Sequence, residues 1–165
     1  RNGDLLFVSG ILGLSKIGLD NFNKESKYLS TAKEKYLLPE PRVNLGLLLN
    51  KVANSMIDIS DGLVQDTTHL AMNSGLCVQL DLSRVPLPYI PNISNKSLLN
   101  AALYGGDDYE LLFSCNPNNE KLLKKISQTI NIKLTNIGNF NIYENDYLRF
   151  KNTSKIPVNK SYLHF

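Results

Sequence analysis

The sequence predicts a single domain of the α/β (α+β) sandwich class, in which helices cover a mixed β-sheet. Strand-like and helix-like segments alternate along the chain, an order that places helices on the faces of a sheet. The last two strand-like segments, 133–140 and 147–151, are separated by a polar turn and are typical of a hairpin, so the sheet is not purely parallel. With 165 residues, of which 42% are hydrophobic, the chain has enough apolar material for one ordinary core.

The N-terminal part of the chain predicts a buried strand and three helical stretches, the last of which follows a proline break. Residues 4–9 form an apolar run typical of a strand, and the glycine-spaced segment 10–19 predicts a turn that leads into a helix. Segment 21–35 is rich in Lys and Glu, which favours a solvated helix and loop. Pro39 and Pro41 exclude a helix interior, although Pro41 suits the first turn of a new helix. The apolar stripe of that helix consists of Leu45, Leu48, Leu49 and Val52.

The C-terminal part continues the same alternation. Residues 77–82 alternate as a half-exposed strand, and segment 84–91, which contains three prolines, predicts a loop. Segment 98–104 predicts a short helix, and residues 110–115 form an apolar run typical of a core strand. An amphipathic helix follows, and its apolar face consists of Leu122, Leu123, Ile126 and Ile130.

The most informative stretch is segment 54–66, which reads as strand, turn and helix. Asp58 and Asp61 lie where the strand ends and the helix begins. The unpaired N–H groups of a helix N-terminus suit phosphate, and two carboxylates tolerate phosphate when a hard cation such as Mg²⁺ lies between them. The turn therefore predicts a metal–nucleotide site, to which Ser60 offers a hydroxyl or a backbone N–H. In the alternative reading, Ser60 or Asp61 only caps the helix and Asp58 is a solvated strand end.

A second acidic stretch supports the site reading. A helical segment ends at the pair Gly105-Gly106, and Asp107, Asp108 and Glu110 follow before an apolar strand begins. Acidic groups placed against apolar walls are costly unless a cation compensates their charge. Two such stretches in one small domain favour a functional site over isolated caps.

Composition narrows the possible functions. The net charge of +3 is spread along the chain without a basic stripe interleaved with aromatics, so nucleic-acid binding is not expected. No apolar run approaches the roughly 20 residues that span a bilayer, so no membrane partner is expected. Cys77 and Cys115 lie far apart and are expected to be buried free thiols in a reducing compartment. His69 and His164 form no ligand spacing, so a zinc site is not expected.

The two acidic motifs, SMIDISDGLVQD and YGGDDYELLF, resemble in order and separation those of the C-terminal half of thiamine-monophosphate kinase. That family shares a superfamily with aminoimidazole-ribonucleotide synthetase, selenophosphate synthetase and a hydrogenase-maturation factor. The resemblance covers nearly the whole chain. It begins with RNGDLLFVSG at residue 1, continues through Pro39-Glu40-Pro41-Arg42, and ends near Ser161-Tyr162.

The resemblance assigns a role to five residues. It implies that Asp58 and Asp61 bind magnesium ions and that Ser60 contacts ATP. Asp107 occupies a position that is usually Glu in the family and contacts the thiamine phosphate, so the shorter Asp side chain needs a water or a shifted loop there. Tyr162 matches an aromatic residue whose ring stacks on thiamine.

Three further residues are candidates with open roles. Asp66, the last acid of the first motif, is either a ligand or a surface charge. Asp108 matches the family pattern without a defined role. Arg42 either contacts a phosphate or forms a salt bridge at the surface or at a domain interface. The sequence also departs from the family pattern at Leu14, which replaces an Asp.

The resemblance implies Mg²⁺-dependent transfer of the γ-phosphoryl group of ATP to thiamine monophosphate, giving thiamine diphosphate and ADP. It implies that residues 1–165 form the C-terminal domain, that an N-terminal ATP- and metal-binding domain precedes it, and that the full-length protein is a cytoplasmic homodimer. The chain alone is expected to be inactive. The rival readings are a sibling ATP-dependent synthetase, a decayed nucleotide-binding or interaction module, and acids that serve only as caps and surface charges.

Overall fold

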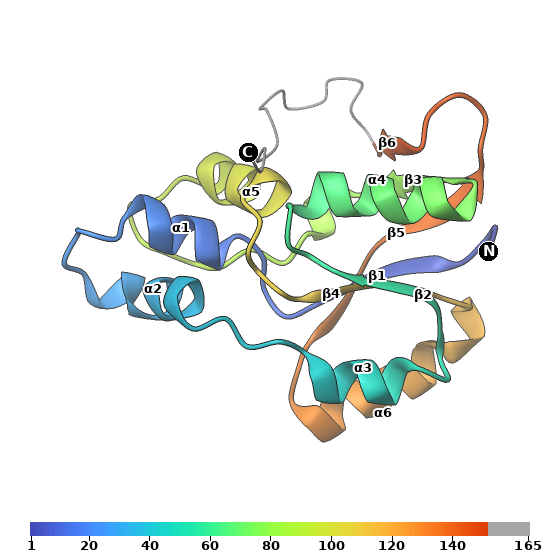
Figure 1. Ribbon diagram of the computed structural model, residues 1–165, viewed down its shortest axis with the longest axis horizontal. Helices are drawn as coiled ribbons and strands as arrows, with labels where there is room; N and C mark the ends of the chain where they lie inside the picture. The colour runs from blue at the N-terminus through green and yellow to red at the C-terminus, as the bar shows by residue number, and fades with distance from the viewer. Residues whose placement is uncertain (152–165) are drawn as a thin grey trace.

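The computed structural model describes residues 1–151 and contains one six-stranded sheet (Figure 1). Its strands lie in the order β2-β4-β1-β5-β3-β6, so neighbours in the sheet are mostly not neighbours in the chain. The predicted α/β class and the mixed sheet are confirmed. The strands are β1 (Leu5–Ser9), β2 (Ala53–Asp58), β3 (Leu76–Leu80), β4 (Leu111–Cys115), β5 (Leu134–Ile142) and β6 (Leu148–Phe150).

Helices cover both faces of the sheet and one of its ends. In Figure 1, α4 and α5 lie above the sheet, α3 and α6 lie below it, and α1 and α2 pack together at the left. No helix of residues 1–151 has the length and apolar character needed to cross a bilayer. The helices are α1 (Leu14–Asp20), α2 (Ser30–Leu37), α3 (Val43–Leu49), α4 (Leu63–Ser74), α5 (Asn95–Tyr104) and α6 (Glu120–Ile130), with short 3₁₀ turns at Lys27–Leu29, Leu82–Arg84 and Pro117–Asn119.

The mixed character of the sheet does not come from the predicted hairpin, which is wrong. β6 pairs with β3 in parallel, with Val78 opposite Leu148, while every other pairing of neighbouring strands is antiparallel. Both edges of β5 are already occupied, by β1 and β3. The chain after β5 therefore passes to the free edge of β3, where Val78 N–H donates to the Tyr147 carbonyl at 2.8 Å.

Alternating side chains of the central strands build a core on each side of the sheet. On β4, Leu112 packs in the cluster under α4 and α5, and Phe113 packs in the cluster against α3 and α6. Phe113 stacks on Phe7 of β1 with ring centroids 5.6 Å apart. The expected buried free thiols, Cys77 and Cys115, are confirmed. This two-sided core fixes the ends of β2 and β4, where the acidic motifs lie.

Two of the predicted apolar helix faces are only partly correct. On α3, Leu45 and Leu49 are fully buried, but Leu48 is exposed. On α6, Leu123 and Ile126 are buried, whereas the exposed Leu122 lies outside the core-facing stripe. Because each helix meets the sheet along one line, only one narrow stripe of its apolar residues reaches the core.

Candidate functional site

The two acidic motifs lie side by side, because the segment before β4 continues the antiparallel pairing with β2. Ile59 N–H donates to the Glu110 carbonyl at 2.8 Å, and Tyr109 N–H donates back to the Ile59 carbonyl at 2.9 Å. One step further, Asp107 N–H donates to the Ser60 carbonyl at 3.0 Å. The residues predicted to contact nucleotide and substrate therefore share one short backbone ladder.

This close approach requires a glycine in the second motif. Gly106 has a φ of +66°, and a Cβ atom there would lie 2.4 Å from the Ser60 carbonyl oxygen. A side chain would both strain the left-handed backbone and push the two motifs apart. The glycine pair that ends α5 thus sets the distance between the two acidic turns.

Asp66 holds the first turn in place. Its Oδ2 accepts hydrogen bonds from the N–H groups of Ser60 and Asp61, each at 3.1 Å. The N-cap residue of α4 is Gly62, and the described residues provide no side-chain hydrogen bond that caps this helix. The interpretation of Ser60 or Asp61 as the cap is therefore wrong. Asp66 is 1% exposed, which rules out the surface-charge alternative. Burial raises the pKa of Asp66 to about 6, against the opposing effect of its two backbone donors.

Asp61, Asp66 and His69 form a candidate metal-binding cluster. One potential ligand atom from each residue lies within 4.8 Å of the others. Asp61 also accepts a hydrogen bond from Gln65 Nε2 at 2.8 Å. The expectation that His69 forms no ligand spacing is wrong, because it lies three residues after Asp66 on α4, a spacing that places the two side chains on one helix face. Two carboxylates supply the hard oxygen ligands that Mg²⁺ takes, so this donor set fits a divalent cation.

Asp58 and Asp107 flank Tyr109 at the exposed side of the site. Asp58 is exposed at the end of β2. Tyr109 Oη donates to Asp107 Oδ1 at 3.4 Å. Burial raises the pKa of Tyr109, and the negative charges of Asp107 and Asp58 raise it further. Asp107 and Tyr109 both have left-handed backbones, with φ of 56° and 50°, a conformation that is uncommon outside glycine and clusters at functional sites.

Asp108 points away from this surface and supports α1. It is 7% exposed and accepts hydrogen bonds from Gly13 N–H at 2.6 Å and Ser15 N–H at 3.4 Å. Gly13 is the N-cap of α1 and has no side chain, so Asp108 supplies the missing acceptor from a distant part of the chain. Burial raises the pKa of Asp108 to about 7, against the opposing effect of the Gly13 and Ser15 N–H donors, and the charges of Glu110 and Asp107 add smaller increases. The structure thus gives Asp108 a positioning contact.

Arg42 makes a salt bridge with Glu110, the last acid of the second motif. Arg42 Nη2 lies 2.7 Å from Glu110 Oε1, and Arg42 Nε donates to Glu110 Oε2 at 2.9 Å. Ser9 Oγ donates to the same carboxylate. Arg42 and Glu110 are 13% and 4% exposed, so this bidentate pair is largely buried. The remaining predicted site residue, Tyr162, lies outside the residues that the structure describes.

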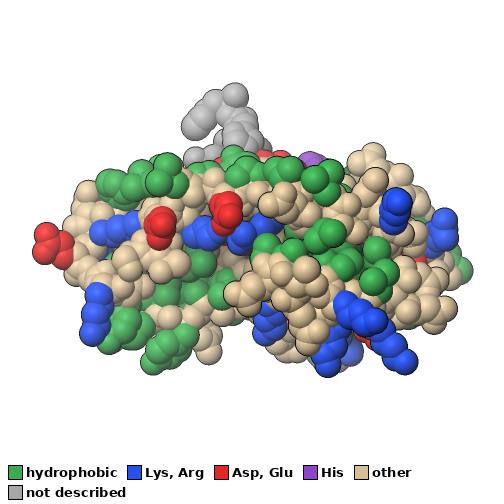
Figure 2. Space-filling model, turned by 90° about the horizontal axis from the view of Figure 1, so that it is seen from below, with side chains coloured by type: hydrophobic (Ala, Val, Ile, Leu, Met, Phe, Trp, Pro, Cys, Tyr) green, Lys and Arg blue, Asp and Glu red, His purple; other side chains and the backbone are tan. Residues whose placement is uncertain are grey.

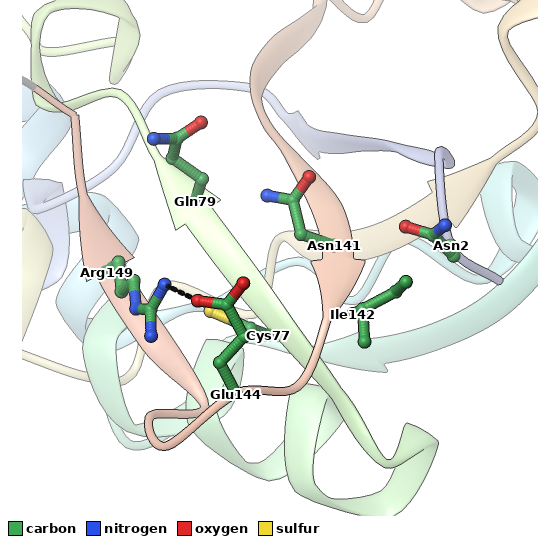
Figure 3. Close-up of a pocket in the computed structure, with 7 residues that line it drawn as sticks. All are labelled: Asn2, Cys77, Gln79, Asn141, Ile142, Glu144 and Arg149. Carbon is green, nitrogen blue, oxygen red and sulfur yellow. Dashed lines mark hydrogen bonds and ion pairs between the residues drawn. The ribbon is translucent and has the colours of Figure 1, made fainter.

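A separate pocket on the sheet contains none of the predicted site residues (Figure 3). It has a volume of about 340 Å³ and lies over β3, β5 and β6. Arg149 and Glu144 close one side of it through a 2.7 Å ion pair, and the amides of Gln79 and Asn141 project from the strands. The acidic site, where β2 ends and β4 begins, is therefore distinct from this cavity.

Known proteins resemble the chain in both sequence and structure, although no protein-family model matches it. A thiamine-monophosphate kinase of Buchnera aphidicola is 36% identical over 173 residues, covering 100% of this chain and 54% of the relative. A thiamine-monophosphate kinase of Haemophilus influenzae is 33% identical and covers 95% of this chain. The chain spans about half the length of the curated relatives it matches.

Solved structures give the same result. The thiamine-monophosphate kinase of Stenotrophomonas maltophilia superposes with a TM-score of 0.87 at 26% identity, covering 94% of this chain and 52% of that one. AaThiL complexed with AMPPCP and TMP superposes with a TM-score of 0.75 at 28% identity, covering 94% and 50%. Escherichia coli HypE, a hydrogenase maturation protein, is 15% identical with a TM-score of 0.69, a likeness of fold alone. By sequence and by fold, the chain belongs to the thiamine-monophosphate kinase family and corresponds to about half the length of its relatives.

Proposed function

We propose that the protein containing this chain transfers the γ-phosphoryl group of ATP to thiamine monophosphate in the presence of Mg²⁺, giving thiamine diphosphate and ADP. The observation that carries the proposal is the hydrogen bond from Asp107 N–H to the Ser60 carbonyl, which brings the two acidic motifs together. The names of the relatives agree with it, and so do the two ligands of the AaThiL complex, AMPPCP and TMP.

The carboxylates of the first motif hold the metal in this proposal. Asp58 and Asp61 are its ligands, and the geometry adds Asp66 and His69 beside Asp61. Mg²⁺ bound there neutralises the charge of the transferring phosphoryl group. Asp66 has a second duty, since its contacts with the N–H groups of Ser60 and Asp61 keep the turn in one conformation.

The remaining residues orient the two substrates. Ser60 offers its hydroxyl to ATP. Asp107 contacts the substrate from the neighbouring turn, and a water or a shift of its loop compensates for its short side chain. Tyr162 is proposed to stack on thiamine. Arg42 is paired with Glu110 and Glu40, so its part in this reaction is to position the second motif. Phosphoryl transfer needs mainly positioning and charge neutralisation, and the phosphate of thiamine monophosphate attacks directly.

Because the chain spans about half the length of its relatives, the proposal includes a further domain. We propose that an N-terminal domain supplies the rest of the ATP and metal site and the contacts of a homodimer, that the full-length protein is cytoplasmic, and that residues 1–165 alone are inactive. Turnover by the isolated chain would refute the last of these statements.

The decisive experiment uses the full-length protein. It is incubated with ATP, Mg²⁺ and thiamine monophosphate, and thiamine diphosphate is quantified by oxidation to its fluorescent product. Asp58→Asn removes one proposed ligand charge and is expected to lower kcat by about 10²-fold or more. Asp146→Asn, an exposed residue paired with Arg149, is the matched control and is expected to retain wild-type turnover. A folded wild-type protein that forms no thiamine diphosphate would favour a decayed nucleotide-binding module or a sibling synthetase instead.

A further inference from the structure

A groove with three basic side chains lies between α2 and the start of β5. Lys35, Arg42 and Lys133 line it, and its volume is about 380 Å³. Arg42 also borders a neighbouring cavity of about 330 Å³. The groove, hereafter the α2–β5 groove, belongs to the face that carries α2, α3 and α6, where Figure 2 shows Lys and Arg side chains interrupted by acidic ones. Its size is within the range of small-molecule pockets.

Arg42, which lines the α2–β5 groove, is held in place by two hydrogen bonds. Its Nε and Nη2 atoms are occupied by the buried carboxylate of Glu110, at 2.9 Å and 2.7 Å. Gly10 makes room for that carboxylate, because a Cβ atom there would lie 2.3 Å from Glu110 Oε1. A guanidinium fixed by two bonds presents its remaining Nη1 donors in a defined direction, which favours recognition of an oxyanion.

A carboxylate of the chain itself occupies that direction. Glu40 Oε2 lies 3.1 Å from Arg42 Nη1 and 3.9 Å from Lys35 Nζ, so one oxygen bridges two cations. Glu40 is 72% exposed, whereas Arg42 and Lys35 are 13% and 26% exposed. An exposed ion pair contributes little to stability, so this carboxylate is easily displaced.

Lys133 gives the groove a cation that has no ion-pair partner among residues 1–151. The side chains that line the groove include three cations and one carboxylate, Glu110. Glu40 lines the neighbouring cavity and meets the groove through its ion pairs with Lys35 and Arg42. Ile11 and Ile132 form an apolar wall beside these charges.

We propose that the α2–β5 groove binds a phosphate group, as the free ion or as a small phosphomonoester, between Lys35, Arg42 and Lys133, and that Glu40 occupies the oxyanion position when no ligand is bound. The phosphate oxygens replace the Glu40 carboxylate on Arg42 Nη1 and Lys35 Nζ and gain Lys133. Glu110 does not leave, since its carboxylate is buried and bound by Ser9 as well as Arg42. Of the two acidic motifs the groove contains Glu110 alone, and it needs no metal.

Binding is tested with the full-length protein by isothermal titration calorimetry in EDTA, without nucleotide, so that failure of the kinase proposal has no effect on the result. The probes are inorganic phosphate and phenyl phosphate. Lys133→Gln is expected to weaken phosphate binding about tenfold, the loss of one charge-assisted contact. Lys121→Gln, which removes an exposed lysine of α6, is its control and is expected to change the affinity by less than about twofold.

A Glu40 variant distinguishes loss of the competing carboxylate from the general effect of removing one negative charge. Glu40→Gln is expected to tighten binding by about threefold or more, because the internal competitor is lost. Glu34→Gln removes an equal charge from the exposed surface of α2 and is expected to have a smaller effect. Tighter binding of phenyl phosphate than of phosphate assigns the groove to a monoester, and equal binding assigns it to the free ion. The proposal is overturned by absence of saturable phosphate binding, by Lys133→Gln binding like wild type, or by equal effects of Glu40→Gln and Glu34→Gln.

Discussion

Asp108 is expected to make the domain less stable as the pH rises toward neutrality. Its pKa is raised from 3.8 to about 7 in the folded protein, chiefly by burial. Between these two values the folded state binds a proton that the unfolded state has released, so the free energy of unfolding falls as the pH increases. The stabilisation is complete below about pH 4 and is lost as the pH passes through about 7. The difference corresponds to at most about 4 kcal/mol.

Two substitutions separate the charge of Asp108 from its hydrogen bonds. Asp108→Asn keeps an oxygen that accepts from Gly13 N–H and carries no charge. It is expected to equal or exceed wild-type stability at pH 8 and to flatten the pH dependence. Asp108→Ala removes the acceptor of a buried N–H group at the start of α1 and is expected to lose about 1–3 kcal/mol at pH 5.

The assay is urea denaturation followed by far-UV circular dichroism at several pH values between 4 and 8. Asp20→Asn, which alters an exposed residue paired with Lys16, is the control and should keep the wild-type slope. Asp66, whose pKa is raised to about 6, adds a slope of the same sign that persists in every variant. An Asp108→Asn variant with an unchanged slope, or one less stable than wild type at pH 8, would contradict the reasoning.

Two further predictions concern buried carboxylates. Glu110→Ala leaves the largely buried Arg42 guanidinium without its partner and is expected to lower the free energy of unfolding by about 3–5 kcal/mol in urea denaturation. The double variant Glu110→Leu with Arg42→Met is expected to recover most of this loss. A loss below about 1 kcal/mol in the single variant would count against a buried pair. Asp66→Ala removes the acceptor of the Ser60 and Asp61 N–H groups and is expected to lower the free energy of unfolding by about 2 kcal/mol. Asp66→Asn keeps an acceptor and is expected to lose less. Equal losses in the two variants would show that these hydrogen bonds do not hold the turn.

Local pattern was sufficient to predict most elements and the place of the first motif. The apolar run before Asp58 and the helical spacing after Asp61 correctly predicted a strand end and a helix start. The roles that depend on distant parts of the chain were not predictable in this way. Asp108 finds its partners in Gly13 and Ser15, and Glu110 finds Arg42, through tertiary packing that no short window of sequence contains.

Strand pairing was mispredicted for the same reason. A polar turn between two strand-like segments predicted a hairpin, but β5 already has a neighbour on each edge, and β6 joins β3 instead. Competition between strands for an edge is a property of the whole sheet. The position of His69 near Asp61 and Asp66 differs, since its helical spacing from Asp66 is a local feature of the sequence.

The hydrogen bond between Asp107 and Ser60 makes the two proposed substrate contacts thermodynamically linked. A ligand that shifts the Ser60 carbonyl must move Asp107 or break the 3.0 Å hydrogen bond from Asp107 N–H. The backbones of the two turns are in close contact at Gly106, so one turn cannot move toward the other without displacing it. If nucleotide binding changes the affinity for the second substrate by a given factor, the second substrate changes nucleotide affinity by the same factor. The short ladder between the motifs is thus a route by which each substrate can sense the other without direct contact.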